Sequence, residues 1–227
     1  MIRLFDITFA LLSLMILSPI FIVISLLLRM TGEGEIFFLQ RRIGFRGNVF
    51  HLIKFVTMLK DSPNIGTKTI TVYNDPRILK VGHFLRKTKI NELPQLINVL
   101  YGDMSLIGPR PLTTQTFSGY QEEEQKKILS VRPGLSGIGS IVFRDEEAIL
   151  KDNNSNTKYY SDIISPYKAK LEIWFVERKS LLMYFLLIFI TIYIIVIPNV
   201  SFLWRIFTSL PEPPLELKSK LSNLNNQ

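Results

Sequence analysis

The chain has 227 residues, a formal net charge of +8 and a positive mean hydropathy. This length suits one domain, or two. Its excess of cations suits nucleic acid, anionic lipid headgroups or phosphorylated substrates, but no zinc-finger, basic-zipper or RNP signature of a nucleic-acid module is present. The chain has no cysteine, so disulfide and thiol chemistry are excluded, and its two histidines form no histidine-rich metal motif.

The first element is an apolar run of 22 residues at Ile7–Leu28. As a helix it is long enough to cross a bilayer core of about 30 Å. Ser18 and Pro19 lie inside it, and a proline removes one helical hydrogen bond, so we expect a kink there. Composition alone favours a kinked spanning helix over a re-entrant helix that leaves on the side where it entered.

Charges near this run predict its orientation and its edge. Arginines are more frequent after the run than before it, so the following domain is expected to be cytoplasmic. Asp6 stands at the front edge of the run, and Arg3 is its neighbour one helical turn away. We therefore expect Arg3 and Asp6 to form an ion pair.

Short elements are predicted in the middle of the chain. Glu35–Arg42 and Val49–Met58 have the composition of two strands, and the glycine-containing turn at 44–47 predicts a hairpin between them. A helix is predicted at Gln121–Ser130. The acidic run 145–147 is typical of a solvated surface, although carboxylates can also hold a divalent ion.

The last third of the chain contains two further helical patterns and a polar end. Pro166–Lys179 is amphipathic, and its apolar face with Leu171 and Trp174 fits either an interfacial membrane helix or an ordinary core-packing helix. Leu181–Ile197 is apolar but of borderline length for a membrane span. The tail from Pro211 is polar, and we expect little order in it.

The stretch Leu85–Pro111 combines basic residues with a predicted helix start. Asn91 is placed to cap a helix with Pro94 in its first turn, and Gly102 is placed to end it. Capping does not explain why several charged residues gather around one helix start. A helix N-terminus with arginines and a carboxylate, which can hold Mg²⁺, predicts a phosphate or pyrophosphate site. Those charged residues are Arg86, Lys87, Lys89, Glu92 and Arg110.

These pieces, taken together, resemble the bacterial sugar transferase family, the monotopic phosphoglycosyl transferases that act on polyprenol phosphate. The resemblance extends from Arg3 to about Gly137 and more loosely beyond. The matching pieces are Arg3-x-x-Asp6, Ser18-Pro19, Gln40-x-Arg42-x-Gly44-x-x-Gly47-x-x-Phe50, Lys54-Phe55-x-Thr57-Met58, Asp75-Pro76-Arg77, Phe84-Leu85-Arg86-Lys87-Thr88, Glu92-Leu93-Pro94-Gln95-Leu96, Gly102-Asp103-Met104-Ser105, Gly108-Pro109-Arg110-Pro111 and Arg132-Pro133-Gly134.

The resemblance implies a fold, a location and a reaction. The first apolar run would be a re-entrant helix broken at Ser18 and Pro19, and amphipathic helices would rest the protein on the cytosolic face of the bacterial inner membrane. The reaction would pass a sugar-1-phosphate from a UDP-sugar to undecaprenyl phosphate, with Mg²⁺ as cofactor. Membrane lipid would be a further partner, and a homodimer or partner glycosyltransferases are also compatible with the family.

The resemblance also assigns roles to residues. In this family an Asp-Glu pair is the catalytic centre, in which the Asp attacks the β-phosphorus and the Glu supports the metal. Glu92 would be the metal-binding Glu, and Asn91 stands at the catalytic Asp position. The basic residues implied to bind substrate are Lys54, Arg86, Arg110 and Arg132.

Asn91 departs from the family pattern, because an amide oxygen is a far weaker nucleophile than a carboxylate. Four hypotheses follow from it. The enzyme uses an altered route, in which Asp103, Asp145 or Glu146 attacks or the polyprenol phosphate attacks directly. Alternatively, Asn91 was introduced into an ordinary enzyme, the chain is a silent membrane-bound binding or scaffold protein, or it is a plain membrane-anchored domain.

The predicted fold class is α+β and mostly helical, a monotopic membrane protein with an N-terminal re-entrant helix, a small β-hairpin and amphipathic interfacial helices. The predicted divisions are a re-entrant helix at 1–30, a catalytic domain at 31–165, membrane-associated helices at 166–204 and a polar tail at 205–227.

Overall fold

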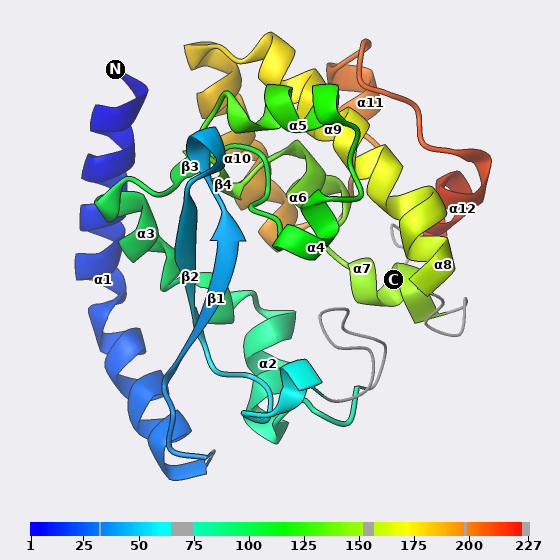
Figure 1. Ribbon diagram of the computed structural model, residues 1–227. Coiled ribbons are helices and arrows are strands. Elements are labelled where there is room, and N and C mark those ends of the chain that lie inside the picture. Colours follow the sequence, from blue (N-terminus) through cyan, green and yellow to red (C-terminus); the bar gives the residue numbers. More distant parts are fainter. Residues whose placement is uncertain (32, 65–74, 152–156, 198, 224–227) are drawn as a thin grey trace.

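The computed structural model describes residues 1–31, 33–64, 75–151, 157–197 and 199–223. The fold is α+β and mostly helical, as predicted, with two small sheets (Figure 1). The helices are α1 (Ile2–Thr31), α2 (Lys80–Lys87), α3 (Gln95–Tyr101), α4 (Thr114–Phe117), α5 (Glu122–Leu129), α6 (Ile138–Val142), α7 (Glu146–Lys151), α8 (Thr157–Tyr159), α9 (Ser165–Arg178), α10 (Leu181–Val196), α11 (Leu203–Ile206) and α12 (Leu215–Asn223). Short 3₁₀ turns lie at Phe45–Gly47 (η1), Ser62–Asn64 (η2) and Ile90–Glu92 (η3), and a π-helical turn lies at Tyr160–Ile164 (η4).

The predicted hairpin is confirmed. β1 (Phe37–Ile43) pairs antiparallel with β2 (Val49–Phe55), and the register places Ile43 opposite Val49 and Phe37 opposite Phe55. Alternate side chains of β2 face the core, so Phe50 and Leu52 are buried against α3. The second sheet is a short parallel pair of β3 (Ser105–Ile107) and β4 (Gly134–Ser136).

Asn98 joins α3 to the free edge of β2. Its side chain accepts a hydrogen bond from Ile53 N at 3.0 Å and donates to His51 O at 2.8 Å. A sheet edge presents unpaired backbone groups, and one buried amide satisfies a donor and an acceptor of this edge. The contact fixes α3, and the 3₁₀ turn η3 that precedes it, against the inward face of β2.

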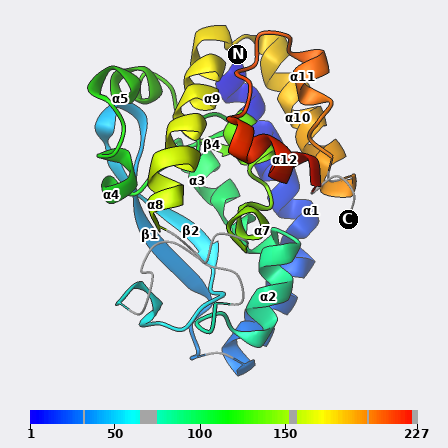
Figure 2. The same cartoon turned by 90° about the vertical axis from the view of Figure 1, so that its right-hand side faces the viewer.

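α1 lies along the rest of the protein for most of its length (Figures 1 and 2). Its inner side chains recur every three or four residues and pack on two parts of the core: Ala10, Leu14, Leu17, Phe21, Ile24 and Leu28. The opposite side exposes large apolar residues such as Ile16, Val23 and Leu26. Among the described residues, α1 is the helix whose length and composition would allow it to cross a membrane.

The helix continues through Ser18 and Pro19, although Figure 1 shows that its course bends. Pro19 has no amide hydrogen to donate to the carbonyl four residues earlier, which is that of Met15. The hydroxyl of Ser18 donates to this carbonyl at 2.8 Å instead. The serine therefore replaces the hydrogen bond that the proline removes, and the helix continues across the pair.

Arg3 and Asp6 hold the first turns of α1 to the domain, and the predicted ion pair between them is wrong. Arg3 donates to the carbonyls of Val99 and Leu100 at the end of α3. Asp6 is buried, and its Oδ1 accepts from Ser105 Oγ, Leu106 N and Tyr184 Oη at 2.9, 2.9 and 2.7 Å. The partners of these two side chains lie between 96 and 178 residues away in the sequence, and spacing within one helix cannot reveal them.

The largest core cluster lies among the C-terminal helices. The apolar face of α9, including Leu171 and Trp174, is buried there, as the core-packing interpretation of 166–179 has it. One face of α10 joins it, while Phe189 and Ile192 on another face are exposed. The expectation of little order in the tail is wrong for α12: leucines four residues apart, Leu217 and Leu221, form an apolar face that packs into this core.

Candidate phosphate-binding site

Lys54, Glu92 and Arg110 come together from three separate elements. Lys54 Nζ lies 3.1 Å from Glu92 Oε1, and Arg110 Nη2 lies 2.8 Å from the same oxygen. Arg110 Nη1 donates to Glu92 Oε2 at 3.4 Å. The sequence predicted all three as site residues, and the structure brings them into contact.

Local structure explains each position. Lys54 shares the inward face of β2 with Phe50 and Leu52, so it points toward α3 and η3. Glu92 is the last residue of η3, and Leu93 and Pro94 separate it from the start of α3. Arg110 lies in the turn 108–111 after β3, where Gly108 N donates to Ser136 O and Pro109 O accepts from Gly134 N. A Cβ on Gly134 would lie 2.1 Å from Gly108 N, so this close backbone contact requires glycine.

Arg42 adds a third cation. Its guanidinium donates to Gln40 Oε1 at 2.6 and 3.2 Å and to Pro111 O at 3.0 Å, so it also holds the turn that carries Arg110. Lys54, Arg110 and Arg42 thus gather around the single carboxylate of Glu92, and we refer to these four residues as the Glu92 cluster. Their formal charge is +2, and an anion of about two charges would complete it.

The electrostatics of the cluster favour an anion. Burial would raise the pKa of Glu92, but Arg110 and Lys54 hold it well below its usual range. Burial lowers the pKa of Lys54 to about 8, helped by Arg110 and Arg42 and opposed by Glu92. Burial, followed by repulsion from Arg110, likewise lowers the pKa of Arg42 to about 10. Cations whose charged forms are disfavoured gain most from a bound anion.

Asn91 does not cap the helix, contrary to the prediction. The turn η3 comes first, with Lys89 in the left-handed region at φ 60°, and Pro94 occupies the cap position of α3. Asn91 is 5% exposed, and its Oδ1 has no hydrogen-bond partner among the described residues. The predicted helix end at Gly102 is confirmed, with φ 92°. Asn91 therefore presents a buried, unused oxygen directly beside Glu92 in the chain.

The three carboxylates considered as substitute nucleophiles differ in position. Asp103 follows the C-terminal end of α3, opposite to the end that carries Asn91, and accepts from Asn98 Nδ2 at 3.2 Å. Asp145 is exposed. Glu146 interacts electrostatically with Arg110, but Lys168 already binds its Oε1 at 2.6 Å. Glu146 is thus the one of the three with a shown interaction with the Glu92 cluster.

Arg86 and Arg132 were also predicted to bind substrate. Arg86 is half-buried in the last turn of α2, the helix that leads into η3. Arg132 lies at the other end of α3, where its Nε donates to Gly102 O at 2.9 Å and its guanidinium lies over Phe45. The structure does not bring Arg132 into the Glu92 cluster. β4 runs parallel to β3, so Arg132, just before β4, lies beside Gly102, just before β3.

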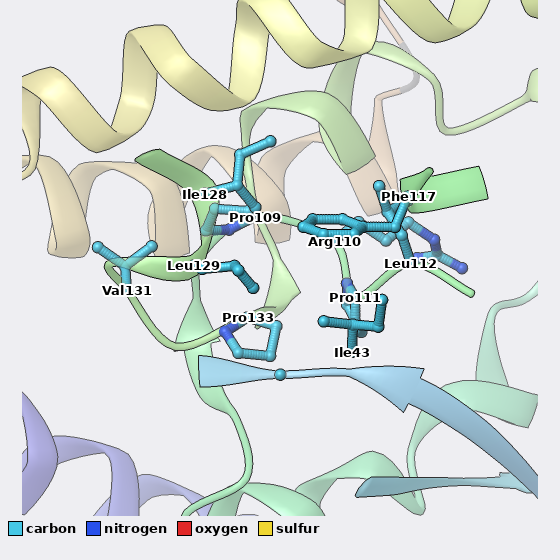
Figure 3. Close-up of a pocket in the computed structure, with 11 residues that line it drawn as sticks. Ile43, Pro109, Arg110, Pro111, Leu112, Phe117, Ile128, Leu129, Val131 and Pro133 are labelled. Carbon is cyan, nitrogen blue, oxygen red and sulfur yellow. The ribbon is translucent and has the colours of Figure 1, made fainter. Parts of the chain in front are cut away.

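An apolar crevice lies beside the turn that carries Arg110 (Figure 3). Its walls come from β1, from α4 and α5 and from the proline-rich turns, and include Ile43, Pro109, Pro111, Phe117, Ile128 and Pro133. Among the described residues that line the crevice, Arg110 is the only ionisable one. The crevice is narrow, with about 10 Å³ of free space, and it places an apolar surface next to the charged site.

Two residues around this site escaped the sequence prediction. The sequence motif that contains Arg42 predicts no role for this residue, although alternation along a strand indicates that Gln40 and Arg42 share one face. Glu172 on α9 is buried, and its Oε1 accepts from the backbone N–H of Arg110 at 3.2 Å. A carboxylate next to the apolar Leu171 and close to Trp174 is an unusual choice for a core helix, and this was the available signal.

Comparison with known proteins places the chain among sugar transferases. The undecaprenyl-phosphate glucose phosphotransferase of Komagataeibacter xylinus is 36% identical over 66% of this chain and 29% of its own length. The exopolysaccharide production protein ExoY of Rhizobium meliloti is 31% identical over 74% of this chain and 82% of its own. The Escherichia coli UDP-glucose:undecaprenyl-phosphate glucose-1-phosphate transferase is 35% identical over 75% and 36%.

The chain thus spans less than half of two of these relatives and most of the third. The family model described as bacterial sugar transferase matches residues 1–198, which include α1, the hairpin, the whole Glu92 cluster and both apolar helices α9 and α10. The match covers well over half of the chain, and the protein belongs to the bacterial sugar transferase family.

Proposed function

We propose that this protein transfers a sugar-1-phosphate from a UDP-sugar to undecaprenyl phosphate, an early membrane step in the synthesis of a bacterial polysaccharide or glycan. The observation that carries the proposal is the Glu92 cluster, in which three buried or half-buried cations surround one carboxylate. The names of the relatives from Komagataeibacter xylinus and Escherichia coli support the choice of donor and acceptor.

The cations would hold the diphosphate of the donor. Arg110 has a guanidinium that can contact two phosphate oxygens at once, and Lys54 adds a point charge. Both already lie within 3.1 Å of Glu92, so they are ordered before substrate arrives. Preorganised cations stabilise the charge that develops on phosphate oxygens during transfer, which is the main contribution a protein makes to this reaction.

Asn91 favours direct transfer over a covalent intermediate. Its amide is a poor nucleophile. In the direct route a phosphate oxygen of undecaprenyl phosphate forms a bond to the β-phosphorus of the donor. The bond from this phosphorus to the oxygen that bridges the two phosphates breaks, and UMP leaves with the electron pair. The products are UMP and undecaprenyl diphosphate sugar.

Mg²⁺ is the cofactor that we propose for this site. Mg²⁺ commonly takes one or two protein oxygens and completes its shell with phosphate oxygens and water. The carboxylate of Glu92 and Oδ1 of Asn91, which has no partner within the described part of the chain, are two such oxygens on adjacent residues. When bound, the ion would neutralise charge on the diphosphate, while Lys54 and Arg110 orient it.

We further propose that the protein rests on the cytosolic face of the inner membrane. The exposed apolar side of α1 supports contact with lipid, and a re-entrant course would keep both of its ends on one side. The acceptor is a lipid phosphate, so a site beside this helix would meet its substrate at the membrane surface.

A direct experiment tests the proposed function. The protein is purified in detergent or nanodiscs and incubated with undecaprenyl phosphate, Mg²⁺ and a panel of UDP-sugars, and UMP is measured. We expect UMP with at least one sugar. If the present chain is silent across the panel but Asn91→Asp releases UMP, the direct route is wrong. If both are silent, the protein acts as a membrane-bound binding or scaffold protein, the alternative that Asn91 by itself favours.

A further inference from the structure

Glu172 has a buried carboxyl group that contacts the backbone of Arg110, a residue of the Glu92 cluster. It lies on α9, and its side chain reaches the turn that carries Arg110, where Oε1 accepts from Arg110 N. The residue is 5% exposed, and its Oε2 has no hydrogen-bond partner among the described residues. Burying a carboxyl group costs free energy of desolvation, so its presence in the core needs an explanation.

The backbone of the turn explains what Glu172 contributes. The turn contains two prolines, Pro109 and Pro111, which have no N–H group, so Arg110 supplies the N–H between them. Glu172 accepts that hydrogen bond at 3.2 Å. The carbonyls of Pro109 and Pro111 are bound by Gly134 N and by Arg42. Glu172 thus completes the set of contacts that fixes the backbone under the Arg110 guanidinium.

Gly139 gives independent support from the opposite side. It lies in α6, and a Cβ at this position would lie 2.3 Å from Glu172 Oε1. A larger residue there would push the carboxyl away from Arg110 N. Its backbone is helical, a conformation that alanine adopts readily, so the backbone does not require glycine here. The lack of a side chain instead leaves room for the carboxyl group of Glu172.

We propose that Glu172 is a positioning residue: it holds the backbone of Arg110, so that the guanidinium meets the diphosphate of the donor in the geometry that transfer requires. This inference rests on the proposed function, because it assigns Glu172 a part in that same site. The path runs from α9 to the Arg110 backbone and from the Arg110 side chain to Glu92.

The chemistry of the carboxyl fits this role. Burial raises the pKa of Glu172 to about 7, against the opposing effects of the Arg110 N–H and of Lys168. A protonated acid keeps an acceptor oxygen for the N–H without a buried charge. Glutamine has the same shape and the same acceptor, so Glu172→Gln should preserve the contact, whereas Glu172→Ala removes it.

The test compares four variants in two assays. Glu172→Ala and Gly139→Ala should both lower kcat for UMP release by about 10- to 100-fold, the loss expected when a charged group is misplaced by about 1 Å. Glu172→Gln should restore most of the activity. Glu177→Gln removes an exposed carboxylate of the same helix, which pairs with Lys127, and should leave kcat unchanged. Thermal melting identifies any variant that fails to fold.

Pyrophosphate binding, measured by calorimetry with Mg²⁺ present, separates this inference from the proposed function. Weaker binding in Glu172→Ala and Gly139→Ala than in Glu172→Gln supports the positioning role even if no UDP-sugar yields UMP, an outcome that would contradict only the proposed function. Equal pyrophosphate affinity and equal kcat in the folded alanine and glutamine variants would overturn the role of Glu172.

Discussion

Asp6 and Glu92 are two carboxylates that the fold holds in opposite ways. Asp6 accepts three hydrogen bonds on one oxygen, from a serine, a tyrosine and a backbone N–H, all of them neutral donors. Glu92 is held by Lys54 and Arg110, with Arg42 close by. The first arrangement is complete within the protein, whereas the second has more positive than negative charge.

The difference indicates that Asp6 has a structural role and Glu92 a functional one. Neutral donors form hydrogen bonds with the buried carboxylate of Asp6, and these bonds join α1 to β3 and α10. The excess positive charge at Glu92 lies in a partly buried site, and binding of an anion would stabilise it. A change at Asp6 should therefore act on stability, and a change at Glu92 should act on the reaction. The predictions below test this division, starting with the largest expected effect.

Glu92→Gln should lower UMP release by about 10²- to 10³-fold, because it removes the carboxylate that orders both cations and would bind Mg²⁺. The melting temperature should change by only a few degrees. Kinetics with saturating donor and acceptor measure the loss, and thermal unfolding of the same sample checks the fold. Nearly intact turnover would contradict the assignment of Glu92 to the metal.

Asp6→Ala should show the reverse pattern. Two buried donors and one partly buried donor would lose their acceptor, at a cost of about 1–3 kcal/mol for each donor left unsatisfied. We expect a melting temperature lower by about 10 °C or more in detergent, with kcat within a few-fold of the parent among folded molecules. An Asp6→Ala protein of normal stability with lost activity would place Asp6 in the site and break the comparison.

The pH dependence of the reaction should follow Lys54. The pKa of Lys54 is about 8 in the folded protein, below its ordinary value, so its charge is lost as pH rises through 8. The free enzyme then binds the diphosphate less well, and kcat/KM should fall above about pH 8. Lys54→Arg keeps its charge and should move this fall to higher pH. An identical profile in both proteins would assign the ionisation to another group.

The same shift has a consequence for stability. Between about pH 8 and 10.5 the unfolded chain holds a proton on Lys54 that the folded chain has released. The contribution of Lys54 to stability therefore rises with pH across this window. Denaturant titrations of the parent and of Lys54→Met at several pH values would show this difference, or its absence.

Ser18→Ala should have the smallest effect. It leaves the Met15 carbonyl without the donor that replaces the one missing at Pro19. An ordinary hydrogen bond contributes about 0.5–1.5 kcal/mol, and this carbonyl is exposed, so the lower end applies. A melting shift of one or two degrees with normal kcat is expected. A large loss of activity would give the bend in α1 a direct part in the reaction.

Local patterns were sufficient to predict part of the fold. The hairpin follows from two strand-like runs around a glycine turn, and α1, α9 and α10 follow from long apolar patterns. The tail differed because two leucines four residues apart suffice to anchor α12. The apolar face of α9 had two possible partners, since lipid and protein core select the same residues. Only tertiary structure could decide between them.

The site shows the same limit. Glu92, Lys54 and Arg110 stand in recognisable motifs, and the fold brings them together as expected. The positions of Asn91 and Arg132 depend on where η3 begins and on which end of α3 meets β4, and neither follows from local propensity. Glu172 acts through a backbone N–H 62 residues away, so no short pattern could reveal its partner.

The central claim is that the Glu92 cluster supports direct transfer in spite of the amide at position 91. The most direct measurement is UMP release by the parental chain, with an accepted UDP-sugar and Mg²⁺, in the presence and absence of undecaprenyl phosphate. Our account predicts UMP only when the lipid phosphate is present, and no phosphosugar adduct by mass spectrometry. A stoichiometric burst of UMP without the lipid, together with such an adduct, would contradict it.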